Sequence, residues 1–400
     1  MRYCPYCVKP VDDDEARYCP DCGGNLAWTA GETQMPVGTL LEGTLLSYRL
    51  GGARGQGGFG VTYTALEQEH GVRVAIKEYF PIRCALRNPD QSVSAKSGME
   101  EEFEKGYDNF FKEVRRLAGI RPLDSVVHVK DCFKTGGTAY LVMEYLDGVP
   151  LFHKLQEMGG KIPANDLLPK LPALIRDLAG LHEEGILHRD ISPDNILWMT
   201  DDTLKLIDFG SARSMEGDKS MTVLLKHGFA PIEQYLTKGQ GTYTDVYALA
   251  ATIYYALTGV IPPSAVDRLE DPYLKTPLEF GSDLTRSQNE AIIRGLAIQP
   301  NERIQTMDDF AAAFFASSPD EEDNTIDEFG TDEGQNTIGE SGTGAGAGDD
   351  LISGADRKAE RKTASEMDTS GVYGKKRRLW PVILIVVIIV VVLLLIFLIR

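Results

Sequence analysis

A glycine-rich stretch is the first part of the chain whose residue types and spacing suggest phosphate chemistry. It contains Gly55, Gln56, Gly57, Gly58, Phe59 and Gly60. A similar pattern occurs in the turn that binds dinucleotides, but that turn leads directly into a helix. Here residues 61–65 follow, and their β-branched and aromatic side chains favour a strand. A glycine loop between two strands lets the backbone approach a triphosphate, because no Cβ atom blocks it.

A lysine and a glutamate downstream are suited to hold that triphosphate. Lys77 ends a predicted strand that also contains Ala75, and Glu113 lies on a predicted helix with an apolar face at Phe110 and Val114. A lone lysine is usually a solvated surface charge, so this hypothesis depends on the spacing. We expect a Lys77–Glu113 ion pair to hold the ammonium against the α- and β-phosphates.

Two acidic motifs complete a set of residues suited to phosphoryl transfer. One runs from His188 through Asp190 to Asn195, and the other is the Asp-Phe-Gly motif that begins at Asp208. All these motifs occur in the order and at the spacings of protein kinases. Residues 45–316 therefore resemble the eukaryotic-type (Hanks-type) serine/threonine protein kinase family, in a bacterial branch.

The resemblance implies a role for each matching residue. Asp190 would accept the proton of the substrate hydroxyl, and Asn195 and Asp208 would hold Mg²⁺ ions that bridge the phosphates of ATP. Lys77 would position the phosphates, with Glu113 fixing Lys77. Because the transferred group is highly anionic, catalysis would consist mainly of positioning and of charge stabilisation.

The resemblance also implies a binding site for adenine. Met143 would be the gatekeeper, and the backbone of Glu144 and Leu146 would bond the edge of the base. Leu197 would form part of an apolar floor beneath the ring, and Ala75 belongs to the same set of nucleotide-binding residues. Elsewhere the resemblance implies structural roles, which are an ion pair between Glu233 and Arg303 and a brace for the catalytic loop at Asp245.

One position departs from the family pattern. Ser192 stands where these kinases usually place a lysine that neutralises charge on the γ-phosphate, so the rate and the residue preference stay open. A pseudokinase scaffold with little phosphotransfer is one alternative. Arg189 beside Asp190 suggests control by a phosphate on the activation segment. Thr222 is the first candidate for that phosphate, ahead of two serines, Ser214 and Ser220.

Four cysteines near the N-terminus form two Cys-x-x-Cys pairs. They are Cys4 with Cys7 and Cys19 with Cys22. Two such knuckles facing each other predict a closed tetrahedral site for structural Zn²⁺, typical of a zinc ribbon. The redox alternative, similar to a glutaredoxin motif, would need a strand before the first pair. A further alternative is that this ribbon is an interaction module which the kinase domain regulates.

The chain divides into four predicted regions around an α+β, two-lobed kinase fold. They are a zinc ribbon (1–28), the kinase domain (45–316), a disordered acidic linker rich in Gly, Ser and Thr (317–379), and a transmembrane helix (380–400). The linker contains a short repeat centred on Thr325 and Thr337, which suggests phosphorylation sites for a phosphothreonine-binding partner, or chance similarity.

The last region has the composition of a membrane span. Residues 381–399 contain no polar side chain, and Lys375 to Arg378 are all basic. Positive flanks stay in the cytoplasm, so we expect a single-pass protein of the cell membrane whose kinase domain is cytoplasmic. Tethering to the lipid bilayer would favour self-association. We see no N-terminal signal peptide, and the cysteines fit a reducing compartment.

The net charge argues against one class of partner. The formal charge is −18 at pH 7, whereas nucleic-acid binders are usually basic. We therefore expect protein substrates and no nucleic acid.

Overall fold

The computed structural model describes residues 2–209, 213–214, 226–236 and 239–316, which all lie in one compact unit, Met1–Gly330. The predicted linker, its two threonines, the predicted span and the candidate phosphosites Ser220 and Thr222 lie outside the described residues. Among the helices of the described part, none is long and apolar enough to cross a membrane.

A six-stranded antiparallel sheet forms the small lobe. Its order is β3-β4-β5-β6-β10-β9. The strands are β3 (Leu40–Glu42), β4 (Ser47–Gly57), β5 (Gly60–Glu67), β6 (Arg73–Tyr79), β9 (Val129–Thr135) and β10 (Thr138–Glu144). Successive side chains of a strand point to opposite faces, so Val74 and Ile76 both enter the core of this lobe. That core also contains Met35 and Leu41, which precede the predicted start of the kinase domain.

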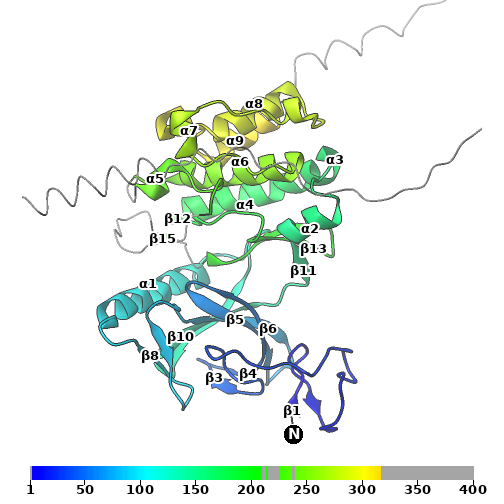
Figure 1. Cartoon of the computed structure of the whole chain (residues 1–400), viewed down its shortest axis with the longest axis vertical. Helices are drawn as coiled ribbons and strands as arrows, with labels where there is room; N and C mark the ends of the chain where they lie inside the picture. The colour runs from blue at the N-terminus through cyan, green and yellow to red at the C-terminus, as the bar shows by residue number, and fades with distance from the viewer. Residues whose placement is uncertain (1, 210–212, 215–225, 237–238, 317–400) are drawn as a thin grey trace, which may run out of the picture. The chain divides into compact units, whose positions relative to one another are not determined.

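One long helix, α1 (Glu100–Ala118), packs beside the sheet (Figure 1). Three glutamates in its first turn and two arginines in its last turn complement the helix dipole. Val114 and Leu117 are its buried contacts toward the larger core. A hairpin of β7 (Ala85–Arg87) and β8 (Val93–Ala95) precedes the helix.

Helices dominate the large lobe (Figure 1). They are α2 (Leu151–Glu157), α3 (Ala164–Leu167), α4 (Leu171–Glu183), α5 (Ile232–Tyr235), α6 (Thr242–Thr258), α7 (Asp267–Glu270), α8 (Arg286–Gly295) and α9 (Met307–Phe314). Helix α6 is buried along nearly its whole length, as its mostly apolar sequence requires, and α8 and α9 pack against it. It ends at Gly259, whose φ of 74° is the left-handed conformation that glycine adopts without strain.

Short strands of the large lobe hold the loops beneath the sheet. They are β11 (Gly148–Pro150), β12 (Ile186–Leu187), β13 (Ile196–Met199), β14 (Leu204–Leu206) and β15 (Arg213–Ser214). Strands β13 and β14 pair with each other, and β12 pairs with β15. The large-lobe core extends to Leu141 and Met143 of β10, so the two lobes share packing at their junction. The predicted two-lobed α+β kinase fold is confirmed.

Candidate active site

A buried aspartate on α6 fixes the loop that carries Asp190. The carboxylate of Asp245 accepts hydrogen bonds from the backbone N–H groups of His188 (2.8 Å) and Arg189 (2.7 Å). His182 Nε2 lies 2.8 Å from the same carboxylate. Although burial opposes its ionisation, the hydrogen bond and charge of His182 hold the pKa of Asp245 below its usual value. This arrangement holds Arg189 at a φ of 64° and confirms the predicted brace.

The buried His188 joins the loop to the strand before Asp208. Its Nδ1 accepts from the N–H of Asp190 (3.3 Å), and its Nε2 lies 3.1 Å from the carbonyl of Ile207. This pattern requires a neutral ring protonated on Nε2, and burial indeed lowers the pKa of His188. The ring also packs edge-on against Phe209 at 4.8 Å between centroids. The histidine thus sets the spacing between the two acidic motifs.

Asp190 and Asn195 lie in direct contact. Asn195 Nδ2 donates to the backbone carbonyl of Asp190 (2.8 Å) and to its Oδ2 (2.9 Å). Because the amide nitrogen is engaged, the amide oxygen is the Asn195 atom that suits a metal ion. With the Asp208 carboxylate it provides the hard oxygen ligands that Mg²⁺ prefers. Burial raises the pKa of Asp190, against the opposing charge of Lys226.

Lys77 reaches across the lobe junction. Its position in β6, between Thr62 of β5 and Leu141 of β10, places it in the middle of the sheet, and its side chain is buried. Lys77 Nζ forms an ion pair with Asp208. Glu113 lies on α1 as expected, and its pair with Lys77 stays a prediction.

A buried polar network supports the strand that carries Lys77. The neighbouring Glu78 accepts from Arg87 at both oxygens (2.8 and 2.6 Å), from the Tyr140 hydroxyl (2.9 Å) and from the Tyr63 hydroxyl (3.0 Å). Glu78 is completely buried. Sequence reasoning missed this network. The signal in the sequence was Glu78 itself. It is a charged residue two positions after Ile76, so it lies on the strand face that points into the core.

The predicted glycine loop is the tip of the hairpin between β4 and β5. Gly57 pairs with Gly60, so Gly58 and Phe59 form the turn. A Cβ atom on Gly60 would lie 2.2 Å from the carbonyl oxygen of Glu78, so this position requires glycine. Cβ atoms at Gly55 and Gly57 would enter open space, which leaves room above the backbone for a phosphate chain.

The residues predicted to hold adenine meet where the two lobes join. Ala75 and Met143 are cross-strand partners in β6 and β10, and Leu197 lies on β13 of the large lobe. The N–H of Glu144 donates to the carbonyl of His128 at 3.0 Å. The Glu144 carboxylate receives Lys205 at 2.6 Å, so its side chain serves the fold. Leu146 packs against the large core.

The segment after residue 225 adds a second cation to the site, and this one lies beside Asp190 whereas Lys77 pairs with Asp208. Lys226 Nζ donates to Ser192 Oγ at 2.6 Å and lies 3.4 Å from Asp190 Oδ1 and 3.8 Å from Asp194 Oδ2. Sequence reasoning identified the missing lysine at position 192 but not this replacement. The two positions are 34 residues apart in the chain, and no local pattern links them.

The end of the same segment is anchored by a buried ion pair. Arg303 Nη1 donates to Glu233 Oε1 at 2.7 Å, and the second pair of atoms lies 3.3 Å apart, as predicted. Both side chains are buried. Next to this pair, Gln234 Nε2 donates to the carbonyl of Arg189 at 2.7 Å. The activation segment is therefore tied to the catalytic loop.

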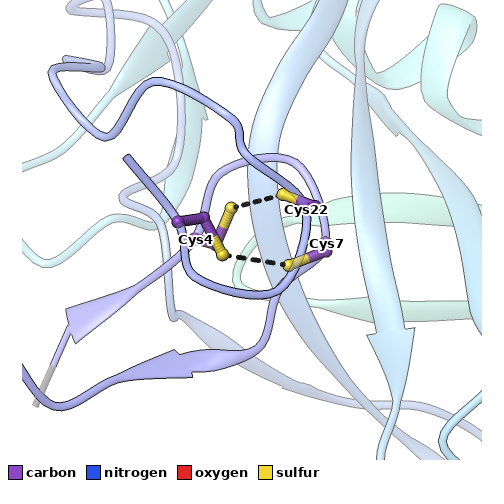
Figure 2. A group of neighbouring side chains, drawn as sticks. Cys4, Cys7 and Cys22 are labelled. Atoms are coloured by element: carbon purple, nitrogen blue, oxygen red, sulfur yellow. Dashed lines mark hydrogen bonds between the residues drawn. The ribbon is translucent and has the colours of Figure 1, made fainter. Parts of the chain in front are cut away.

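The four N-terminal cysteines converge, as the zinc hypothesis requires. Figure 2 shows the sulfurs of Cys4, Cys7 and Cys22 turned toward one another. The Sγ atoms of Cys4 and Cys22, and those of Cys7 and Cys19, are each 3.6 Å apart, and all four lie within 4.8 Å of one another. A tetrahedral site with Zn–S bonds of about 2.3 Å needs sulfurs about 3.8 Å apart. The cysteines therefore fit structural zinc.

The backbone favours the thiolate form at one of the four cysteines, Cys19, whereas burial raises the pKa of Cys4 and Cys7. Gly23, at a φ of 70°, donates to the carbonyl of Cys19 and closes the second knuckle. Burial, which opposes ionisation, is outweighed at Cys19 by the N–H groups of Cys22 and Asp21, which lower its pKa to about 7. A thiolate is the form that ligates zinc. Strands β1 (Arg2–Tyr3) and β2 (Pro10–Val11) frame the first knuckle.

The zinc ribbon packs directly on strand β4 of the small lobe. The N–H of Gly52 donates to the carbonyl of Pro5 at 2.7 Å. A Cβ atom at Gly51 would lie 2.7 Å from that same carbonyl and 2.9 Å from Val8. In the segment that follows the ribbon, Thr33 Oγ1 accepts from Gln56 Nε2 at 2.7 Å. Gly51 and Gly52 therefore allow close contact with the ribbon, whereas Gly55 and Gly57 near the hairpin tip leave room for phosphate.

Comparison with known proteins agrees with this architecture. The protein kinase domain family matches residues 48–307. Serine/threonine-protein kinase pkn2 of Myxococcus xanthus is 30% identical over 217 residues, which are 52% of this chain and 24% of that protein. Serine/threonine-protein kinase PknE of Mycobacterium bovis is 29% identical over 292 residues, which are 69% of this chain and 47% of that protein.

A solved structure matches as well. The structure of PpkA-294 in its apo form has a TM-score of 0.61 and 33% sequence identity, and the match covers 70% of this chain and 99% of that chain. The chain spans less than half the length of the two curated relatives. The family match covers well over half of the chain, and the fold and the acidic motifs agree with it. The chain therefore belongs to the protein kinase family.

Proposed function

We propose that the chain is a protein kinase that transfers the γ-phosphoryl group of ATP, with Mg²⁺, to serine or threonine hydroxyls, including its own. The arrangement of Asp190, Asn195 and Asp208 around a loop fixed by the buried Asp245 supports this proposal most strongly. Lys77 reaches Asp208 from the small lobe, so both lobes contribute to one site.

Each residue has a defined task in this reaction. Asp190 aligns the substrate hydroxyl and accepts its proton, and the contact from Asn195 Nδ2 keeps the carboxylate in place. Mg²⁺ bound by Asn195 and Asp208 would neutralise charge on the phosphates. Lys77 positions the α- and β-phosphates, and Gly55 and Gly57 let the hairpin backbone cover them.

The test is incorporation of labelled phosphate from ATP and Mg²⁺ by the full chain. Asp190→Asn and Lys77→Ala are measured beside the wild type, with ATP affinity determined separately and phosphosites mapped. We expect the wild type alone to incorporate label, on serine or threonine. Equal incorporation by Asp190→Asn would refute the role of Asp190 as the base.

A nucleotide-binding scaffold with little phosphotransfer is the second candidate, favoured by Ser192 at the position of a family lysine. The two candidates differ in a single readout. A wild type that binds ATP but labels neither itself nor a generic protein substrate would support the scaffold.

A third reading, in which the zinc ribbon is an interaction module, has its own test. Loss of partner binding on deletion of residues 1–30, with phosphotransfer unchanged, would assign the binding function to the ribbon.

The cellular setting that fits this chain is the inner face of the cell membrane. The apolar residues 381–399 and the basic residues just before them support a single lipid-embedded helix with a cytoplasmic kinase domain. Tethering would raise the local concentration for phosphorylation between copies, and Thr325 and Thr337 would then recruit a phosphothreonine-binding partner. Release of the chain by salt washing, without detergent, would contradict the tether.

A further inference from the structure

Lys226 occupies a defined position beside the catalytic carboxylate. Its Nζ donates to the hydroxyl of the fully buried Ser192 and forms an ion pair with Asp190 at 3.4 Å. Among the ion pairs of the described residues, Lys226 supplies the one cation paired with Asp190. The third neighbour, Asp194, lies 3.8 Å away. The ammonium therefore lies among two carboxylates and a hydroxyl, within reach of any group that Asp190 contacts.

A fixed turn holds Lys226 in place. Its carbonyl accepts from the N–H groups of Phe229 and Ala230, both at 3.1 Å. Gly228 within this turn has a φ of 86°, and a Cβ atom there would lie 2.5 Å from Ile261. The Phe229 side chain is buried against Tyr255, with 6.0 Å between ring centroids. The backbone of Lys226 thus belongs to the packed large lobe.

From this geometry we infer that Lys226, delivered by the activation segment, supplies the cation that stabilises the transferring phosphoryl group, with Ser192 orienting its ammonium. The inference rests on the proposed function and adds a catalytic residue to it. A lysine at position 192 would lie on the catalytic loop itself. Here a serine leaves space, and the charge arrives from a segment 34 residues away.

Phosphoryl transfer past Lys226 exchanges one phosphorus–oxygen bond for another. The substrate hydroxyl oxygen forms a bond to the γ-phosphorus of ATP, and the bond from that phosphorus to the bridging β,γ-oxygen breaks. ADP leaves with that electron pair, and the hydroxyl proton moves to Asp190. Lys226 keeps all its protons and donates an N–H to an equatorial phosphoryl oxygen, where a preformed cation acts most effectively.

One consequence is that catalysis depends on the placement of the activation segment. When the turn at Gly228 is in place, the ammonium is in the site. A displacement of this turn would take from the site a cation that kinases with a catalytic-loop lysine retain. Lys226 is shared between the partly buried carboxylate of Asp190 and the exposed carboxylate of Asp194.

The test compares kcat, the KM for ATP and nucleotide affinity in the full chain. Lys226→Met removes the charge but keeps most of the stem, and Lys226→Arg keeps the charge. The double variant Ser192→Lys/Lys226→Met restores a cation from the catalytic loop. Lys161→Met, at an exposed site of the large lobe, is the matched control. Thermal unfolding of every variant reports on folding.

We expect Lys226→Met to lower kcat about 100-fold or more, as for removal of one transition-state donor, with little change in nucleotide affinity. Lys226→Arg should retain far more activity, Ser192→Lys should recover at least tenfold in the double variant, and Lys161→Met should match the wild type. A Lys226→Met variant as fast as the wild type, or faster, would overturn the inference, and a faster one would show that the lysine restrains Asp190.

A loss shared equally by Lys226→Arg and not relieved by Ser192→Lys would also overturn it, because charge would then not be the relevant property. The wild type is measured in the same assay. A wild type that transfers no phosphate refutes the proposed function and this inference with it, whereas an active wild type with an equally active Lys226→Met refutes the inference alone.

Discussion

Replacing Glu78 by Gln tests whether the buried network beneath Lys77 sustains the small lobe. Glu78 is fully buried, and its two oxygens accept four hydrogen bonds, two of them from Arg87. An amide has one acceptor oxygen, so its NH₂ group would face N–H and O–H donors. The variant therefore leaves the Arg87 charge buried without a counter-charge, among Tyr63 and Tyr140.

The expected loss is large compared with the stability of a typical domain. Breaking a buried ion pair by removing one partner costs about 3–5 kcal/mol. Domains are stable by about 5–15 kcal/mol in total. For a domain of this size, about 2–4 °C of Tm corresponds to each kcal/mol, so the melting temperature should fall by about 6–20 °C. Because Lys77 is adjacent to Glu78 in β6, the affinity for ATP should fall as this strand loses its support.

The measurement is urea and thermal unfolding of the full chain, with Arg87→Met and the double variant to complete a cycle. Removing both charges should cost clearly less than the sum of the single losses. The control is Glu290→Gln. Its partner Arg286 is exposed, so the change should stay within about 0.5 kcal/mol. A Glu78→Gln loss below about 1 kcal/mol, or strict additivity in the cycle, would refute the reasoning.

Two further predictions concern zinc and pH. The purified chain should contain one zinc ion. Chelation or Cys7→Ser should lower the melting temperature of the kinase domain, because a ligand at 100 times its Kd contributes about 2.7 kcal/mol of stability. An unchanged Tm after verified zinc loss would contradict this prediction. Asp245 has a folded-state pKa below its unfolded value of about 3.9, so its stabilisation is complete above that pH and disappears as the pH falls through the folded value. The Tm gap between wild type and Asp245→Asn should therefore narrow in acid, and a constant gap would exclude this linkage.

Motifs predicted the kinase fold because phosphoryl transfer constrains residue type and spacing together. Asp190, Asn195 and Asp208 must each meet phosphate, metal or hydroxyl, so their order along the chain identifies the catalytic loop. The zinc site could be predicted from the spacing of the cysteines in the same way, because four thiolates around one ion permit few arrangements. Structural matches such as Glu233 with Arg303 were found for the same reason, through position within a recognised pattern.

Contacts between distant residues could not be predicted where neither the motifs nor the family pattern linked them. Ser192 could be read only as a missing lysine, because the compensating Lys226 comes from a segment whose path is set by packing of the large lobe. The ion pair between Lys77 and Asp208 was likewise not predicted, because it joins a strand of the small lobe to a loop of the large lobe. Which carboxylate Lys77 engages depends on the arrangement of the lobes and not on the spacing of residues.

The close contact of Gly51 and Gly52 with Pro5 has a consequence for how such sequences diverge. Any side chain at position 51 would clash with the ribbon backbone, so we expect the ribbon and these two glycines to be retained together in evolution. In related chains that have lost the cysteine pairs, position 52 should be free to take ordinary strand residues, whereas position 51 stays tight because its Cβ atom would also lie 3.2 Å from the carbonyl oxygen of Thr64 on β5. A glycine pair at this place in the strand would then mark kinases that carry a docked ribbon, even where the N-terminal residues have diverged.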